Sequence, residues 1–233
     1  MTVSTFYPDA DPETTSVDGF IGHTSAQPAG ASWASKRDAV DGSTATPSGA
    51  TMDCRIASAD DTGSGWELFE RIFTLFDTAT GLPDTDTISE VTLEVVCESK
   101  ANTISGAPQS VTVITTTPAS NTNLVIGDYD QVGTVHQSGD LTIASITADS
   151  ATFNVFTFNA TGRDNVSKTG VSKFGIRIVS EADNAEPAHT GQGGVEGRVT
   201  LSTAEEILVG DKRPKLVVPH AEAATFVPRV TIF

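Results

Sequence analysis

The sequence predicts an all-β protein, an antiparallel β-sandwich of jelly-roll type with an extended N-terminal segment. Two observations support this class. Short stretches alternate apolar and polar residues, as in 91–97, where Val91, Leu93, Val95 and Cys97 share one face of a strand. Turn residues such as Gly, Asp, Asn and Ser separate these stretches, and no convincing amphipathic helix is evident. Strands of this kind have one wet face and one face that packs on a second sheet.

Residues 1–65 consist mostly of Ser, Thr, Gly, Ala, Asp and Pro, with only short apolar islands. Islands of this size cannot close a hydrophobic core by themselves. We therefore expect an extended N-terminal segment that packs on the sandwich or on a neighbouring subunit. Trp33 and Trp66 are its expected anchors, because large aromatic side chains bury the most apolar surface.

The densest apolar stretch covers 66–76 and carries large apolar side chains on both faces. Phe69, Phe73 and Leu75 share one face, whereas Leu68 and Ile72 lie on the other. This pattern favours a central strand covered on both sides, with a helix as the rival interpretation. The following stretch, 77–84, is rich in turn residues and predicts a loop.

The remaining chain to residue 218 completes the predicted sandwich domain, 66–218, and 219–233 form a C-terminal strand extension. No period of 40 to 50 residues recurs in the sequence, which favours a jelly roll over a propeller. Further strands are predicted at 88–98, 110–117, 141–146, 151–159, 172–179, 197–202, 206–209, 214–219 and 225–232.

The charge balance argues against nucleic-acid binding. The chain has 14 Lys and Arg against 30 Asp and Glu, a formal net charge of -16. A surface of this sign repels a phosphate backbone. The acidic residues are scattered singly, as expected of a solvated surface.

The cysteines, the N-terminal sequence and the lengths of the apolar runs indicate in which compartment the protein is made. Cys54 and Cys97 have no metal-ligand spacing, and the sequence leaves open whether they form a disulfide. The N-terminus lacks a basic region followed by an apolar one, and no run of about 18 apolar residues occurs. We expect synthesis in a host cytoplasm without a signal peptide, and no membrane partner.

No residue pattern predicts catalysis, so we expect a protein that is not an enzyme. The histidines lack a Ser, Cys or carboxylate partner at a recognisable spacing, and there is no Gly-x-Ser-x-Gly motif. No cofactor is expected, although two acidic loops are weak candidates for structural calcium because hard cations bind loop oxygens. The candidate calcium ligands are Asp9, Asp11, Asp128 and Asp130.

Carbohydrate binding is an alternative that the fold class allows, since jelly rolls often present aromatic residues to sugar rings. Aromatic residues make up only 6% of this chain, and Trp33, Trp66 and Tyr129 have no spacing that indicates a platform. The competing interpretation places the tryptophans in the core or in an interface.

Several stretches match, in order along the chain, the pattern of a known family: 5–10, 14–20, 71–78, 82–93, 127–133, 171–178 and 213–218. In these pieces the chain resembles the DNRLRE family, a jelly-roll family of phage virion and bacterial surface proteins. The resemblance implies a jelly-roll fold and a role in a virion or at a cell surface. Each piece is a packing or turn pattern, so the resemblance specifies the fold much better than the function.

Together these observations predict a phage virion structural protein, a capsid decoration or tail-associated subunit that acts through subunit contacts in the virion. Its partners would be other virion proteins and further copies of itself. The alternatives are a carbohydrate-binding adhesion module on a phage or bacterial surface assembly and a self-polymerising surface filament. The residues expected at interfaces are Phe6, Trp33, Val230, Ile232 and Phe233.

Overall fold

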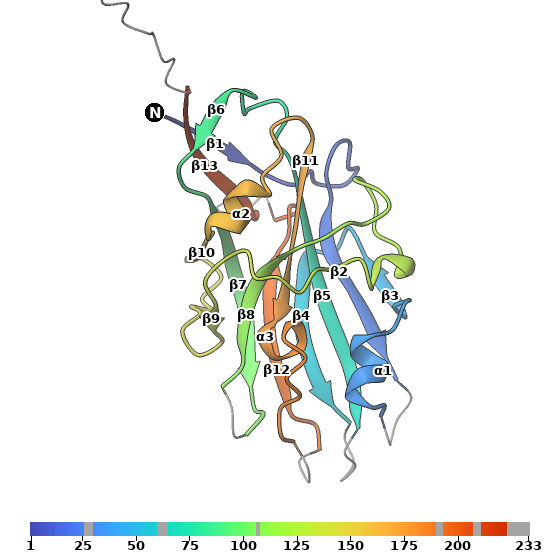
Figure 1. Ribbon diagram of the computed structural model, residues 1–233. Coiled ribbons are helices and arrows are strands. Elements are labelled where there is room, and N and C mark those ends of the chain that lie inside the picture. Colours follow the sequence, from blue (N-terminus) through green and yellow to red (C-terminus); the bar gives the residue numbers. More distant parts are fainter. Residues whose placement is uncertain (26–29, 60–64, 106–107, 190–192, 207–210, 223–233) are drawn as a thin grey trace, which may run out of the picture.

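The computed structural model describes residues 1–25, 30–59, 65–105, 108–189, 193–206 and 211–222. Within these ranges thirteen strands form a continuous antiparallel sheet that curls on itself (Figure 1), and four short helical segments lie in the connections. The predicted all-β, jelly-roll class is confirmed. No helix in these ranges is long and apolar enough to span a membrane.

The strands are two to twelve residues long. The strands are β1 (Thr2–Phe6), β2 (Asp18–Thr24), β3 (Thr44–Thr46), β4 (Thr51–Ser58), β5 (Trp66–Asp77), β6 (Asp86–Ile88), β7 (Thr92–Asn102), β8 (Ser110–Thr115), β9 (Leu141–Thr142), β10 (Phe153–Thr157), β11 (Val171–Ile178), β12 (Glu196–Ser202) and β13 (Lys215–Glu222). The helical segments are α1 (Trp33–Arg37), the 3-10 turn η1 (Ile126–Asp128), α2 (Ala160–Asp164) and α3 (Val179–Ala182).

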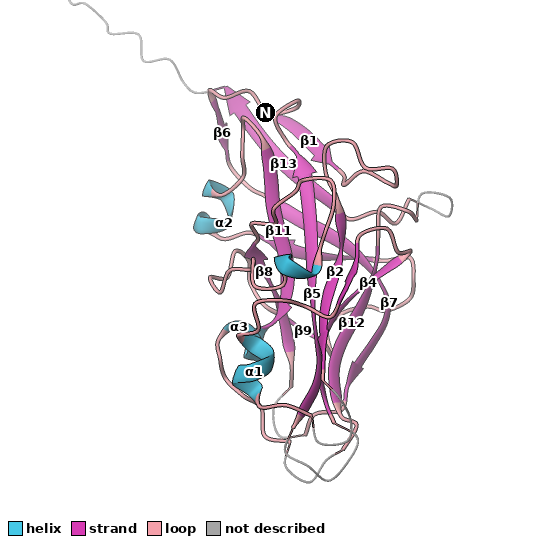
Figure 2. Ribbon diagram, turned by 90° about the vertical axis from the view of Figure 1, so that its right-hand side faces the viewer, coloured by secondary structure: helices cyan, strands magenta, loops and turns pink. Residues whose placement is uncertain are grey.

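Strand β7 joins the two layers of the fold. Its first half pairs with β13 and with β10, and from Cys97 onward it pairs with β12. A register shift at Thr200–Leu201 of β12 lies beside this change of partner. Irregularities of this kind bend a strand and let it pass from one layer to the next. Figure 2 shows β1, β6 and β13 at one end of the molecule and the far ends of β4, β5 and β12 toward the other.

Strand β5 is the central strand that the sequence predicts. Leu68–Thr74 pair with β2, while Trp66–Glu70 pair with β4 and Ile72–Asp77 pair with β11. Because the β2 pairing overlaps both others, β2 occupies one edge of β5, and β4 and β11 share the second. Nearly all β5 side chains are buried. The prediction of a strand covered on both faces is confirmed.

The described part of residues 1–65 supplies β1 to β4 and the short helix α1. The boundary that composition suggests at residue 65 is not a break in the sheet, because β4 and β5 pair directly. Glycine permits one close approach in this segment: a Cβ at Gly19 of β2 would lie 2.1 Å from the Thr46 carbonyl oxygen of β3.

Helix α1 is a single capped turn that covers the β2–β5 region. The hydroxyl of Ser32 accepts a hydrogen bond from the Ser35 amide, which satisfies one unpaired donor at the helix start. The helix buries Trp33 against the aromatic side chains of β5, and Lys36 reaches the His23 carbonyl oxygen at 2.7 Å. The turn therefore depends on tertiary packing and not on its own length.

Several predicted strands coincide with observed strands, and others are shorter or shifted. The predicted strand at 141–146 is reduced to two residues, because 143–146 run through a turn. The predicted strand at 225–232 and all but the first residue of the one at 206–209 lie outside the described residues. Cys54 and Cys97 are both buried as free thiols, so the cysteines do not pair.

Candidate functional site

The four predicted calcium ligands occupy two separate loops and are partly committed to holding those loops in shape. Oδ2 of Asp9 accepts hydrogen bonds from the amides and hydroxyls of Thr14 and Thr15. Asp128 is 2% exposed, and its two oxygens accept the amides of Ala119 and Val125 at 2.8 and 3.0 Å. The other two candidates are Asp11, whose amide donates to Glu205, and Asp130, which accepts from Gln131. In the described ranges no three acidic, His or Cys side chains are gathered at metal-ligand distance.

The two predicted interface residues within the described part of the chain are buried in the chain itself. Phe6 is 8% exposed and Trp33 is 5% exposed. Their side chains leave little surface for a second subunit. Val230, Ile232 and Phe233 lie outside the described residues.

The tryptophans pack in the core, where they cannot present a platform to a sugar. Trp33, Trp66 and Phe69 form a cluster with edge-to-face contacts and ring centroids 4.9 to 5.6 Å apart. Trp66 is fully buried, and its indole nitrogen donates to Glu186 at 2.7 Å. Tyr129 is also fully buried. None of the aromatic residues named as sugar-binding candidates is therefore accessible.

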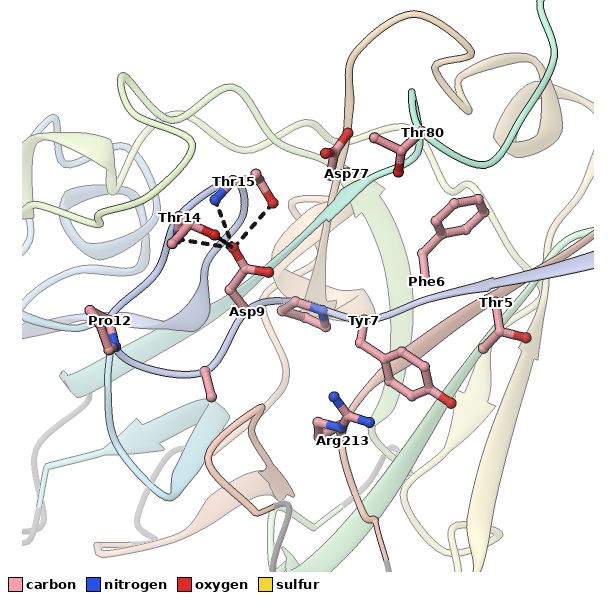
Figure 3. A pocket seen from close by; sticks show the side chains of 12 residues that line it. Thr5, Phe6, Tyr7, Asp9, Pro12, Thr14, Thr15, Asp77, Thr80 and Arg213 are labelled. Atoms are coloured by element: carbon pink, nitrogen blue, oxygen red, sulfur yellow. Dashed lines mark hydrogen bonds between the residues drawn. The ribbon is translucent and has the colours of Figure 1, made fainter.

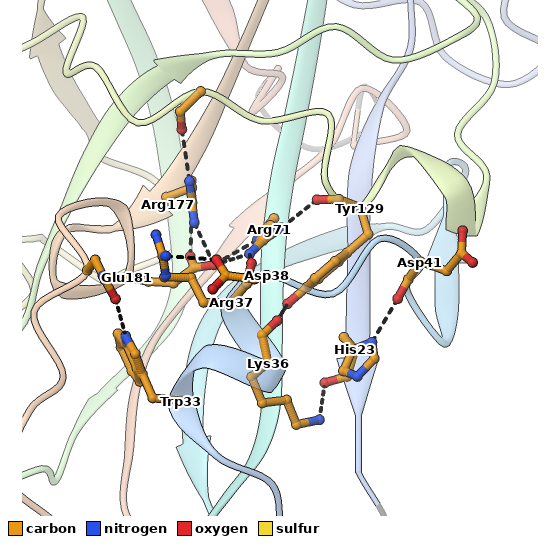
Figure 4. A network of polar contacts seen from close by, with 12 residues as sticks. His23, Trp33, Lys36, Arg37, Asp38, Asp41, Arg71, Tyr129, Arg177 and Glu181 are labelled. Carbon is orange, nitrogen blue, oxygen red and sulfur yellow. Dashed lines mark hydrogen bonds and ion pairs between the residues drawn. The ribbon is translucent and has the colours of Figure 1, made fainter.

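A buried ion-pair network lies between β5, β11 and α3 (Figure 4). Glu181 of α3 accepts from both Arg71 of β5 and Arg177 of β11, with nitrogen–oxygen distances of 2.6 to 3.0 Å. The Arg71 guanidinium also donates to the carbonyl oxygens of Tyr129 and Arg37 and lies 3.8 Å from the centre of the Tyr129 ring. The network joins the sheet to the loop and helices that cover it.

The pKa values in this network follow from burial and charge. Burial alone would raise the pKa of Glu181, but Arg177 and Arg71 outweigh burial and lower it to about 2. Burial raises the pKa of Tyr129 above its ordinary range, and its hydroxyl donates to the Lys36 carbonyl oxygen at 2.9 Å. Burial also lowers the pKa of Lys36 to about 8. Every hydrogen bond named here is internal, so we interpret the network as structural.

One histidine takes part in a chain of contacts that resembles a catalytic triad. The Nδ1 atom of His220 lies 2.6 Å from Asp86 Oδ2, and its Nε2 atom lies 3.0 Å from Ser4 Oγ. However, Ser4 Oγ donates its single proton to the Gly81 carbonyl oxygen at 2.9 Å. The hydroxyl proton of Ser4 is thus used on a backbone carbonyl, which differs from the proton transfer to a histidine that activates a nucleophile. This chain of contacts, the His220 clamp, holds β1, β6 and β13 together.

The other histidines also make local contacts. His23 and His189 contact backbone carbonyl oxygens, and His136 lies between Asp140 and Asp183 at 2.9 and 3.0 Å. None of these three is paired with a Ser or Cys hydroxyl or thiol among the contacts of the described chain. The expectation that the histidines are not catalytic stays a prediction.

A polar groove of about 490 Å³ lies between the end of β1 and the loop that precedes β2. We call it the Tyr7 groove; Figure 3 shows the side chains around it. Its lining combines one half-buried tyrosine ring, two carboxylates, one guanidinium and several hydroxyls, and includes Tyr7, Asp9, Thr14, Asp77, Thr80 and Arg213. Phe6 also lines the groove, and its side chain belongs to the core.

The charges of the groove are fixed by neighbouring groups. Partial burial would raise the pKa of Asp9, but hydrogen bonds from Thr15 and Thr14 lower it below its ordinary value. The Arg213 guanidinium lies 4.1 Å from the centre of the Tyr7 ring and is bound by Asp211 at 2.6 and 3.0 Å. Because Asp211 neutralises Arg213, the acids Asp9 and Asp77 leave the groove with a net negative charge.

Sequence reasoning identified Asp9 but not the groove. Arg213 and Tyr7 are 206 positions apart in the chain, and β1 and β13 bring them together through the antiparallel pair Phe6–Leu216. The local signal was the opening stretch Phe6, Tyr7 and Pro8 next to Asp9, which places an aromatic side chain beside a carboxylate.

Among the solved structures that resemble this fold, one is a polysaccharide-binding module. A solved structure named as a xylan-binding module CBM15 has a TM-score of 0.31 and 12% sequence identity, over 93% of this chain and 95% of that chain. This likeness is too low to support a functional argument. No family model matches the chain, and no curated protein matches it. The resemblance to the DNRLRE family stays a prediction.

Proposed function

We propose that this protein is a carbohydrate-binding module with no reaction centre and that the Tyr7 groove binds a neutral sugar. The observation that carries the proposal is the lining of the groove, where an aromatic ring lies beside two carboxylates and several hydroxyls. Sugar recognition combines stacking of an apolar sugar face on an aromatic ring with hydrogen bonds to the sugar hydroxyls.

The geometry of the groove supports a ligand of this size and polarity. A volume of about 490 Å³ is within the range of small-molecule sites. Among the described residues, every hydrogen bond to the Asp9 carboxylate goes to Oδ2, which leaves Oδ1 to accept a sugar hydroxyl. Arg213 covers one face of the Tyr7 ring. A sugar therefore stacks on the opposite face or against the ring edge.

The charge of the groove selects among sugars. Asp9 and Asp77 repel a carboxylate or sulfate group on the ligand, and Arg213 does not offset them because it is paired with Asp211. We infer that neutral oligosaccharides bind and that acidic ones do not.

The test is a glycan array with neutral and acidic oligosaccharides, followed by calorimetry with the best ligand. Tyr7→Ala should weaken binding by about tenfold or more, which corresponds to about 1.4 kcal/mol. The matched control is Phe153→Ala, because Phe153 is also a partly buried aromatic ring covered by a cation, Lys215 at 4.0 Å. Binding that survives Tyr7→Ala, or an array without neutral ligands, would contradict the proposal.

A second proposal is that the chain is a subunit of a larger assembly, such as a phage virion. The supporting observation is the edge of the sheet: β1 pairs with β13 on one side, and Val3 and Met1 are 58% and 85% exposed. An exposed edge strand can pair with a strand of another subunit. Electron microscopy of purified particles tests this role, and a chain that is monomeric and absent from particles would exclude it.

A further inference from the structure

A small cavity of about 240 Å³ is lined by three guanidinium groups, and we call it the arginine cavity. The groups come from three elements: Arg37 ends α1, Arg71 lies in β5 and Arg177 lies in β11. Figure 4 shows Arg37 beside the network that the other two arginines form with Glu181. Such a gathering of cations stands out in a chain with a formal net charge of -16.

Arg71 and Arg177 share a single carboxylate and keep unused donors. Arg177 uses three of its five N–H groups, two on Glu181 and one on the Gly133 carbonyl oxygen. Arg71 contacts Glu181 through two nitrogens and also donates to two backbone carbonyl oxygens. The pKa of Glu181 is lowered to about 2, so Glu181 is ionised and supplies one negative charge against two positive charges. Both arginines are almost fully buried, and together they keep a positive charge.

Arg37 adds a buried donor that lacks an acceptor. Within the described residues its side chain has one partner, Asp38, whose Oδ1 lies 2.8 Å from Nη2. The Nε atom of Arg37 is buried and has no hydrogen-bond partner. A buried donor without an acceptor is costly, so an oxygen atom supplied from outside is stabilised beside it.

Two acids also line the arginine cavity, but they do not cancel its charge. Asp38 and Asp130 are both exposed, and Asp38 is already paired with Arg37. Charges in contact with water are screened more strongly than buried charges. The remaining lining, Val132 and Thr134, is uncharged and adds one hydroxyl. The buried side of this cavity is therefore positive, in contrast to the Tyr7 groove.

We propose that the arginine cavity binds a small tetrahedral oxyanion of the sulfate or phosphate type. Guanidinium groups donate to such ions through several N–H groups in a fixed geometry. Donors on three separate elements match four tetrahedral oxygens better than the two oxygens of a planar carboxylate. A volume of about 240 Å³ suits an ion of this size and lies below the usual range for larger ligands. The bound ion ties the end of α1 to β5 and β11.

The experiment is a calorimetric titration of the full chain with sodium sulfate at pH 7.5 and constant ionic strength. Wild type should bind a single sulfate, and Arg37→Gln should weaken binding about tenfold or more, because it removes one charge and the unsatisfied donor. The substitution leaves the backbone carbonyl oxygen that accepts from Arg71, so the buried network is retained. Asp38→Asn should strengthen binding about two- to fivefold, since it removes an opposing charge that water screens.

The matched control is Arg198→Gln. Arg198 is also partly exposed and has a buried Nε atom without a hydrogen-bond partner, but it does not line the arginine cavity. Its substitution changes the net charge equally and should leave sulfate binding unchanged. The proposal is overturned if wild type shows no saturable binding or binds no more tightly than Arg37→Gln. An equal loss in the two arginine variants, or tighter binding of acetate than of sulfate, overturns it as well.

A titration with methyl phosphate distinguishes two sources of the same oxyanion. Binding of sulfate without methyl phosphate supports a site for a free ion, and binding of both supports a site for an ion esterified to a larger molecule. These titrations contain no sugar, and Tyr7→Ala should not change them. Failure of sulfate binding and failure of sugar binding are therefore separate results.

Discussion

Glu181 and Asp18 are both 1% exposed carboxylates, yet their surroundings are opposite. Glu181 lies between two guanidinium groups, which lower its pKa to about 2. Asp18 has one amide partner and acidic neighbours, and burial raises its pKa well above the ordinary value. Burial is the same in the two regions, so the difference comes from the partners. The first region is complete within the chain, and the second requires a proton.

The largest loss of stability is expected when the ion-pair network around Glu181 is broken. Glu181→Gln should lower the free energy of unfolding by about 3 to 5 kcal/mol, because it leaves Arg71 and Arg177 buried without a counter-charge. Urea unfolding at pH 7 measures this. The control is Glu94→Gln, a partly exposed glutamate paired with Lys215, for which a loss below about 1 kcal/mol is expected. Equal losses of unfolding free energy in the two variants would show that the buried network contributes no more to stability than a partly exposed ion pair.

The next prediction uses Glu70 of β5, an intermediate case. Burial and Asp53 raise the pKa of Glu70 from 4.5 to about 7, although Arg55 and Arg198 oppose this. Because the folded state resists ionisation, stability should fall as pH rises from about 4.5 to about 7, by at most about 3 kcal/mol. Glu70→Gln should remove this decline. Urea unfolding of both proteins across this pH range is the measurement, and parallel pH profiles would contradict the assignment.

The same contrast explains what the sequence could predict. Strand β5 was predicted because 66–76 are apolar on both faces, a local pattern that burial requires. Strands β1 to β4 were missed because the segment that contains them is rich in Thr, Ser and Gly overall, and because they are stabilised by pairing with distant strands such as β5 and β13. Local composition does not contain that information.

The buried ion pairs were not predictable in detail, because Arg71 and Glu181 are 110 positions apart. One signal was present: Arg71 interrupts the most apolar stretch of the chain, and a charged residue in such a strand requires a buried partner. A similar argument applies to Asp18, which stands between Val17 and the apolar residues of β2. Both positions could have been singled out as buried charges, but not their partners.

A smaller effect is expected at the His220 clamp, where a carboxylate is again satisfied within the chain. Asp86→Asn should lower the free energy of unfolding by about 1 to 2 kcal/mol, since it weakens one charge-assisted hydrogen bond at 2.6 Å. Thermal unfolding measures the loss. Ser4→Ala should cost less, because it removes only neutral hydroxyl contacts at the same end of the sheet. A larger loss for Ser4→Ala would reverse this order.

The last prediction is that Ser4, beside His220 and Asp86, does not react as a catalytic serine. A fluorophosphonate probe labels serines whose proton passes to a neighbouring histidine, whereas the Ser4 proton is donated to the Gly81 carbonyl oxygen. We therefore expect no labelling of Ser4 in the intact protein, measured by mass spectrometry of the modified peptides. Labelling of Ser4 that disappears in a His220→Gln variant would show that the clamp is a catalytic triad. It would also contradict the proposal that the protein has no reaction centre, because the orientation of one hydroxyl proton distinguishes the two interpretations of this geometry.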